Sequence, residues 1–176
     1  FTNKSTLVPR PETELLIYKI VDIFKNKRIN ILDIGTGTGC ILLSLLKELY
    51  NSRGIGIDIS SEAIKIAKAN SSNLNLVNRA KFKNFSIDNY TLGKYDLIVS
   101  NPPYIPSKDI KKLSKDIINF EPKEALDGGS EGLDLIKKVI YKSNILLKRN
   151  GMLALEIGFG QYRRVSEILR HYKFKE

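Results

Sequence analysis

A chemically unusual tetrapeptide, Asn101-Pro102-Pro103-Tyr104, follows the apolar run Tyr95–Ser100. The run predicts a buried strand, so the tetrapeptide would begin where that strand ends. Two successive prolines remove two backbone donors and hold φ at about −65°, which gives the carbonyl of Pro102 little conformational freedom. The Asn101 side-chain oxygen and that carbonyl could accept both hydrogens of a planar NH2 group, with Tyr104 covering its flat face. The alternative interpretation is a proline-stiffened turn without chemistry.

A glycine-rich segment, Gly35-Thr36-Gly37-Thr38-Gly39, is the second candidate site. It lies between a predicted strand at 29–34 and a helical pattern at 41–46. In this arrangement the glycines let a ligand approach the backbone and the amino end of the helix. The spacing G-x-G-x-G differs from the dinucleotide pattern G-x-G-x-x-G, and no Gly-Lys-Ser/Thr follows to form a phosphate-binding loop.

Two acids flank the glycine-rich segment. Asp58 lies 19 positions beyond Gly39, at the end of a predicted strand at 54–58, and is suited to binding a ribose diol. Asp33 comes just before the glycines, where a carboxylate favours a cationic ligand over a pyrophosphate. The two acids favour S-adenosylmethionine, with its ammonium and sulfonium groups, over a nicotinamide dinucleotide. The alternative is that no ligand binds here, with Gly35–Gly39 forming only a tight turn between strand and helix and Asp58 capping a helix.

The elements that must position these residues alternate along the chain. Further strands are predicted at 80–85, 95–100 and 152–157. Ser60 is expected to cap one helix, and Asn150-Gly151 to end another that starts near Leu133. The first helix is expected to start within Pro9–Glu14 and to bury Leu15, Leu16, Ile20, Ile23 and Phe24, and the last helix to carry Tyr162, Val165, Ile168 and Leu169.

This alternation predicts an α/β fold with a doubly wound, mainly parallel sheet covered by helices on both faces. Ligands of such sheets collect at the carboxyl ends of the strands. The glycines, Asp58 and the tetrapeptide should therefore meet over one crevice. The implied reaction is transfer of a methyl group from a sulfonium to an amide or amino nitrogen, oriented by Asn101 and Pro102. The segment Ile105–Glu131 is long and irregular, which is typical of a functional loop.

Composition narrows the remaining possibilities. The 176 residues fit one domain, 1–176, and the net charge of +10 favours an anionic partner such as RNA or a ribosome, unless it reflects only a lysine-rich composition. A single cysteine and a single histidine exclude an internal disulfide, a Cys/His zinc site and a Ser-His-Asp triad, so no metal is expected. We expect a soluble, cytoplasmic protein without a membrane segment, and part of a longer chain.

Taken together, these motifs resemble the HemK-type N5-glutamine methyltransferases. Asn-Pro-Pro-Tyr is shared with adenine-N6 methyltransferases and indicates the reaction type, whereas the Pro-Arg-Pro-Glu-Thr sequence at 9–13 indicates glutamine. The segments that carry the resemblance are Val8–Glu14, Asp33–Gly39, Ser100–Ile105, Phe120–Pro122, Asp127–Gly129 and Gly132-Leu133.

The resemblance implies a class I S-adenosylmethionine-dependent methyltransferase fold, with a closing carboxyl-terminal hairpin and an amino-terminal helical domain that are both absent from these residues. It implies the glutamine of the Gly-Gly-Gln motif in peptide chain release factors as substrate and S-adenosylhomocysteine as a product. Asn101, Pro102, Pro103 and Tyr104 would contact the substrate amide. Contacts to the cofactor would come from Arg10, Asp33, Gly35, Thr36, Gly37, Thr38, Gly39, Asp58, Ile59, Phe85, Ser86 and Asn101.

Two features keep other interpretations open. The family's acid and aromatic pair near the adenine is replaced by Asn84-Phe85-Ser86, with Asp88 following late. The shared tetrapeptide and the charge of +10 allow an adenine-N6 methyltransferase that acts on DNA or RNA. A cofactor-binding domain without catalysis is the third possibility.

Overall fold

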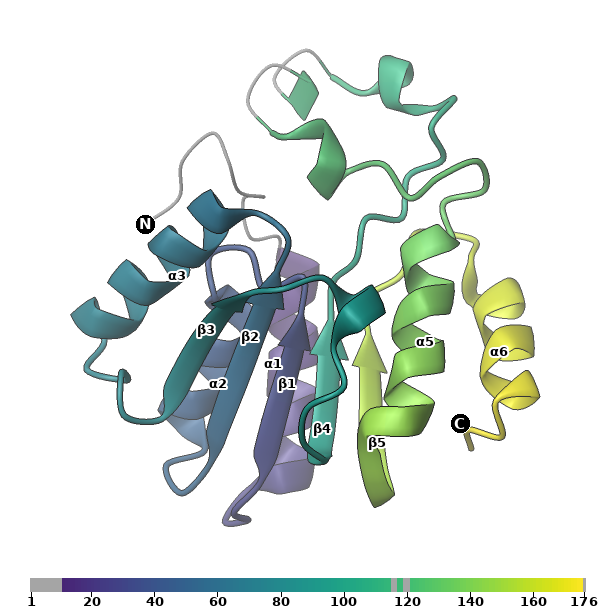
Figure 1. Ribbon diagram of the computed structural model, residues 1–176. Helices are drawn as coiled ribbons and strands as arrows, with labels where there is room; N and C mark the ends of the chain where they lie inside the picture. The colour runs from purple at the N-terminus through teal and green to yellow at the C-terminus, as the bar shows by residue number, and fades with distance from the viewer. Residues whose placement is uncertain (1–10, 115–116, 119–120, 176) are drawn as a thin grey trace.

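The computed structural model describes residues 11–114, 117–118 and 121–175, and these form one five-stranded sheet. All neighbouring strands are parallel, in the order β3-β2-β1-β4-β5 (Figure 1). The predicted doubly wound α/β architecture is therefore confirmed. The strands are β1 (Asn30–Ile34), β2 (Arg53–Asp58), β3 (Ala80–Asn84), β4 (Tyr95–Ser100) and β5 (Leu147–Leu155).

Helices connect the strands and cover both faces of the sheet (Figure 1). Ser60 caps the third helix as expected, because its side chain accepts a hydrogen bond from the backbone N–H of Ala63. The α-helices are α1 (Pro11–Phe24), α2 (Cys40–Glu48), α3 (Ser61–Asn73), α5 (Asp134–Leu146) and α6 (Tyr162–His171), and the short 3-10 turns are η1 (Ile87–Asn89), η2 (Ile110–Lys112) and η3 (Lys123–Ala125).

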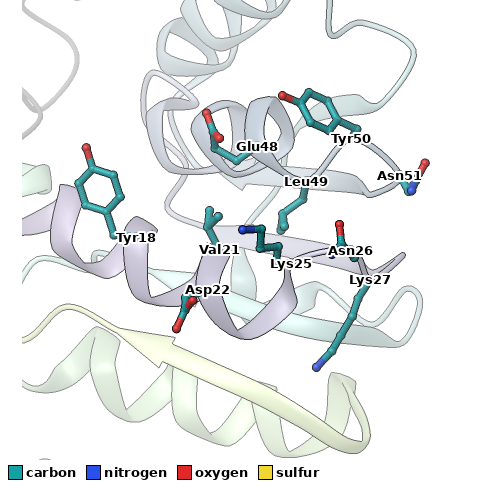
Figure 2. Close-up of a pocket in the computed structure, with 10 residues that line it drawn as sticks. All are labelled: Tyr18, Val21, Asp22, Lys25, Asn26, Lys27, Glu48, Leu49, Tyr50 and Asn51. Carbon is teal, nitrogen blue, oxygen red and sulfur yellow. The ribbon is translucent and has the colours of Figure 1, made fainter.

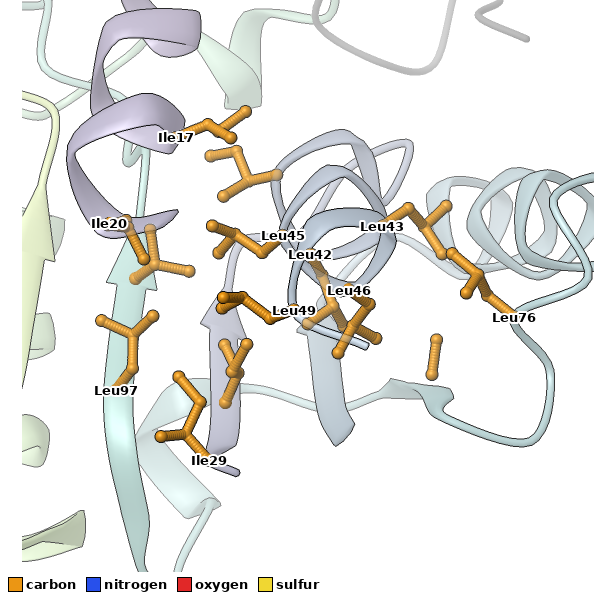
Figure 3. Close-up of a cluster of buried hydrophobic side chains, with 14 of the residues drawn as sticks. Ile17, Ile20, Ile29, Leu42, Leu43, Leu45, Leu46, Leu49, Leu76 and Leu97 are labelled. Carbon is orange, nitrogen blue, oxygen red and sulfur yellow. The ribbon is translucent and has the colours of Figure 1, made fainter. Parts of the chain in front are cut away.

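The central strand β1 is buried on both sides, which explains its nearly unbroken apolar sequence. Ile31 packs into a cluster with side chains of α1, α2 and α3. Figure 3 labels members of this cluster from α1 and α2. Leu32 and Ile34 point to the opposite face, where they join Val139 and Leu146 of α5. Successive side chains of a strand alternate between faces, so one short strand supports both layers of helices.

The buried face of α1 differs from the predicted one. Leu15 and Ile23, expected in the core, are 67% and 48% exposed. The buried residues are Thr13, Ile17, Ile20 and Phe24, whose spacing of four, three and four follows one face of the helix. The prediction is confirmed for Ile20 and Phe24 and wrong for Leu15 and Ile23, because the buried face begins at a threonine, which a count of apolar residues passes over. Leu16 is partly buried against the core.

The predicted end of the helix at Asn150-Gly151 is also wrong. The helix α5 ends at Leu146, and Leu147 already pairs with Tyr95 of β4. The next pair is Leu97 with Met152, so the residues between Leu147 and Met152 bulge out of the ladder. The positive φ of 64° at Asn150 serves this bulge and not a helix end.

The long segment after β4 has a defined base. Ile105 and Asp127 form a parallel bridge, with hydrogen bonds from Ile105 N to Leu126 O (3.1 Å) and from Gly128 N to Ile105 O (2.9 Å). Between these anchors the chain rises above the carboxyl ends of the strands (Figure 1). This position agrees with the predicted functional loop, although the role of the loop stays a prediction.

Within the described part of the chain, no helix combines the length and the apolar character that crossing a membrane requires.

The corrected face of α1 can be tested with two isoleucines of the same helix. Ile20 is 1% exposed and Ile23 is 48% exposed. We expect Ile20→Ala to lower the free energy of unfolding by about 2–5 kcal/mol, because it removes buried methyl groups and leaves a cavity. Ile23→Ala is the matched control and should cost about 1 kcal/mol or less. Urea unfolding of both variants measures the difference, and equal losses would contradict the assigned face.

Candidate functional site

The sheet topology brings the predicted site segments to one edge. β1 hydrogen-bonds to β2 on one side and to β4 on the other, so the loops that leave these three strands are neighbours (Figure 1). The backbone N–H groups of Gly35 and Thr36 both donate to Ile57 O, at 2.9 and 3.0 Å, which fixes the start of the glycine-rich segment against β2. The glycines, Asp58 and the tetrapeptide therefore leave neighbouring strands at one edge of the sheet, whereas the crevice expected between them stays a prediction.

The three loop glycines have positive φ angles of 70°, 54° and 79°, a region that favours glycine, but their surroundings differ. A Cβ on Gly35 or Gly37 would meet no protein atom within 4 Å, so their backbone borders open space. A Cβ on Gly39 would lie 2.9 Å from the Phe82 ring, so Gly39 is required for packing. Thr36 and Thr38 are both buried, so the open space lies beside the glycines of the segment and not beside its threonines.

Asp58 both shapes the glycine-rich segment and remains partly accessible. Its Oδ2 accepts from Gly37 N at 2.9 Å and its Oδ1 accepts from Ser60 N at 2.9 Å. Each carboxylate oxygen has a second lone pair, so both can still accept from a ligand hydroxyl. The sequence prediction placed Asp58 correctly at the end of β2 but did not foresee its bond to the glycine loop.

Asp33 is a buried acid with an unsatisfied oxygen. It has no exposed surface, its Oδ2 accepts from the Thr36 hydroxyl at 2.7 Å, and within the described residues its Oδ1 has no hydrogen-bond partner. Burial raises the pKa of Asp33 to about 7, against the lowering effects of hydrogen bonds from the Thr36 hydroxyl and the Leu42 backbone, and the charge of Asp58 adds to the rise. In a buried site, ionisation of a carboxyl group with an unpaired oxygen is unfavourable, so a cationic group beside Oδ1 would stabilise the ionised form of Asp33.

Exposed apolar side chains follow the ends of β2 and β3. Ile59 is 69% exposed and Phe85 is 38% exposed, and Phe85 N donates to Asp58 O at 2.9 Å. Both can flank a flat ring. Asp88, whose late position left the adenine contact open, instead pairs with Lys138 of α5 at 2.9 Å. The Ser86 hydroxyl accepts from Asp88 N and so caps η1.

The tetrapeptide is held by β4 and by its neighbours. The Ser100 hydroxyl donates to Ile34 O at 2.7 Å, which ties the end of β4 to the end of β1. Pro102 is buried, whereas Asn101 and Tyr104 are half-buried. The structure thus places Asn101 directly beside the strand from which the glycine-rich segment departs.

A glutamine that the sequence prediction missed anchors the tetrapeptide from the other side. Gln161 Nε2 donates to Tyr104 O and Gly132 O, both at 3.0 Å, while its Oε1 accepts from Gly158 N at 2.8 Å. A Cβ on Gly132 would lie only 2.2 Å from Tyr104 O, so glycine is needed there. An isolated glutamine before a helix gives no signal in the sequence, and only its partners reveal this role.

Thr13 and Glu156 also reach the tetrapeptide. The Thr13 hydroxyl donates to Glu156 Oε2 at 2.6 Å, and Asn101 Nδ2 donates to Thr13 Oγ1 at 3.5 Å. The resemblance placed Arg10, within the segment Val8–Glu14, near the cofactor. Arg10 lies outside the described residues, and the described part of that segment contacts Asn101 through Thr13.

Two hollows lie elsewhere on the protein, and none of the predicted site residues lines them. One, of about 390 Å³, opens between the carboxyl ends of α1 and α2, at the opposite edge of the sheet (Figure 2). The other, of about 440 Å³, lies between α5 and α6. Among the described residues, no three His, Cys, Asp or Glu side chains converge as metal ligands.

A family model described as a methyltransferase domain matches residues 25–156. The chain is 44% identical over 164 residues to the release factor glutamine methyltransferase of Rhodospirillum rubrum, covering 93% of this chain and 50% of that protein. It is 40% identical over 169 residues to the protein of the same name from Bradyrhizobium diazoefficiens, covering 94% of this chain and 57% of that protein. The chain thus spans little more than half the length of these relatives.

Solved structures show the same fold. The hMettl16 catalytic domain in complex with a MAT2A 3′UTR hairpin superimposes with a TM-score of 0.79 at 20% identity, covering 100% of this chain and 67% of that one. A ribosomal protein L11 methylase from Lactobacillus delbrueckii gives a TM-score of 0.68 at 20% identity, covering 94% and 71%. At this level of identity the likeness concerns the fold and not the substrate.

The burial of Asp33 predicts a specific pH dependence of stability. The folded state keeps the Asp33 proton up to a pH of about 7, whereas the ordinary pKa is 3.8, so stability falls as the pH rises between these values. Asp33→Asn removes this loss. Between pH 4 and pH 8, we expect the free energy of unfolding of the variant to rise by up to about 4 kcal/mol relative to that of the parent chain. Urea unfolding of both chains across this range measures the gain, and a pH-independent difference would contradict it.

Proposed function

The chain belongs to the methyltransferase domain family, and within that family we propose that it transfers a methyl group from S-adenosylmethionine to the side-chain amide nitrogen of a glutamine. The substrate we propose is the glutamine of the Gly-Gly-Gln motif in peptide chain release factors. The main support is the position of Asn101 and Pro102 at the end of β4, beside the glycine-rich segment that leaves β1. The names of the two relatives support the same substrate.

The residues around the crevice fit S-adenosylmethionine. The unsatisfied Oδ1 of Asp33 suits the ammonium group, and the open space beside Gly35 and Gly37 admits a ligand close to the backbone. Asp58 keeps free lone pairs for the ribose hydroxyls, while Ile59 and Phe85 would flank the adenine. When bound, the cofactor supplies a methyl group made electrophilic by its sulfonium.

The protein side of the reaction is mainly positioning. Asn101 Oδ1 and Pro102 O would accept the two N–H groups of the substrate amide, with Tyr104 against its flat face. This arrangement aims the nitrogen lone pair at the methyl group. As the new N–C bond forms, the S–C bond of the donor breaks, and the nitrogen then loses one proton to water. A strong base is not required, because the methylated nitrogen is acidic before the proton leaves.

The net charge of +10 supports an anionic environment such as the ribosome, where release factors act. It equally supports the second candidate, an adenine-N6 methyltransferase, because adenine also presents a planar NH2 group. The relatives favour glutamine.

Mass spectrometry of a release factor incubated with the chain and S-adenosylmethionine tests the proposal. We expect one added methyl group on the peptide that contains Gly-Gly-Gln. Asn101→Ala should reduce the transfer roughly 100-fold, because it removes one of the two acceptors that orient the nitrogen. Asn51→Ala, an exposed asparagine at the opposite edge of the sheet, is the matched control and should leave the transfer unchanged.

The same experiment separates the alternatives. An unmodified release factor at saturating cofactor concentration would overturn the proposal. Radioactive label from the cofactor in RNA or DNA would then establish the adenine reaction. Binding of S-adenosylmethionine by calorimetry, without transfer to protein or nucleic acid, would establish a cofactor-binding domain without catalysis.

A further inference from the structure

Three side chains from distant parts of the chain meet behind the tetrapeptide. Thr13 lies in the first turn of α1, Asn101 follows β4 and Glu156 follows β5. The Thr13 hydroxyl donates to Glu156 Oε2 at 2.6 Å and accepts from Asn101 Nδ2 at 3.5 Å. Thr13 is only 4% exposed, so water has little access to its hydroxyl.

The backbone holds two of these residues in place. Glu156 N donates to Ser100 O at 3.0 Å, which extends the pairing of β4 and β5 to the residue just before Asn101. The Ser100 hydroxyl in turn donates to Ile34 O. Glu156 and Asn101 therefore depart from adjacent, anchored strand ends, and Thr13 bridges their side chains.

The direction of these hydrogen bonds determines how the Asn101 amide lies. A threonine hydroxyl has one proton, and a carboxylate can only accept. Because the Thr13 proton goes to Glu156, Thr13 offers Asn101 only a lone pair. Asn101 must then turn its NH2 group toward Thr13, which directs its Oδ1 to the other side of the amide. The long distance of 3.5 Å makes this a weak bond, so it sets direction and adds little stability.

We propose that Thr13 and Glu156 are positioning residues. They hold the Asn101 amide so that its oxygen, and not its nitrogen, faces the substrate nitrogen that receives the methyl group. The side-chain orientation is a property of the chain alone, whereas its consequence for catalysis rests on the function proposed above. With its oxygen forward, Asn101 accepts from a substrate NH2 group and repels a carboxylate. Thr13 and Glu156 thus favour glutamine over glutamate, because a flipped Asn101 amide would turn its NH2 group forward, and this group pairs with a carboxylate and not with another NH2 group.

Nuclear magnetic resonance of the chain labelled with [15N]asparagine tests the orientation without substrate or cofactor. The Asn101 NH2 signals are assigned by their loss in Asn101→Asp. Thr13→Val keeps the side-chain shape but removes the hydroxyl, so the Asn101 signals should shift, and Thr13→Ser should restore them. Ser143→Ala removes a buried hydroxyl of α5 that has no hydrogen-bond partner in the described structure, and it should leave the signals unchanged.

Kinetics test the consequence. Thr13→Val should lower kcat roughly 10- to 100-fold, because a misplaced acceptor no longer orients the nitrogen. Thr13→Ser should retain the parent rate. Glu156→Gln should also lower kcat, because a glutamine can donate to Thr13 and free its proton for Asn101, which permits the flipped amide. Adding Thr13→Val to Asn101→Ala should cause no further loss, whereas a merely structural role would add its own effect.

The outcomes distinguish the two proposals. Asn101 signals that do not change in Thr13→Val would overturn the positioning role, whether or not methyl transfer occurs. Changed signals with an inactive parent chain would support the orientation and overturn the proposed function. Equal kcat for Thr13→Val and the parent chain would overturn the catalytic consequence.

Discussion

The site depends on the placement of β1 between β2 and β4. Strand order reverses at this point, because the chain moves from β1 outward to β2 and β3 and then returns to add β4 on the other side. The connections before and after the reversal cover opposite faces of the sheet, so the helices that join the strands leave the edge above β1 uncovered. Hydrogen bonds from Gly35 and Thr36 to Ile57, and from Ser100 to Ile34, keep the three strand ends together.

Polar groups at this edge are mostly satisfied within the protein, as burial requires. The amide of Asn84 donates to Asp58 O and Ile59 O. The Gln161 side chain forms hydrogen bonds with backbone atoms of three separate segments. Against this background the unsatisfied Oδ1 of Asp33 stands apart. Among the described residues, this oxygen is the feature that supports our proposal of a ligand at this edge.

The fold alone does not select a substrate. Structures with the same architecture at 20% identity include a domain in complex with an RNA hairpin and a methylase of a ribosomal protein. Substrate choice in such proteins depends on the side chains at the strand ends. In this chain those side chains include Asn101, whose amide orientation depends on Thr13 of α1, a helix that packs outside the sheet.

The sequence by itself determined the elements and the local chemistry. Alternating patterns gave the parallel sheet, Ser60 marked a helix start, and the residue types of Asn101, Asp33 and Asp58 indicated what each could bind. The strand and helix patterns and the helix cap depend mainly on residues close together in the sequence. Local patterns also misled, since Asn150-Gly151 resembles a helix end although tertiary pairing uses it as a bulge.

Only the tertiary structure decided which polar groups meet. Thr13 and Glu156 are 143 positions apart, and Gln161 lies 57 positions from Tyr104, so no local pattern could pair them. Their roles come from hydrogen bonds between strand ends and a helix that the folded core brings together. A hydrogen bond requires a donor and an acceptor at about 3 Å in the right direction, and that condition is met only after the sheet and its helices have packed.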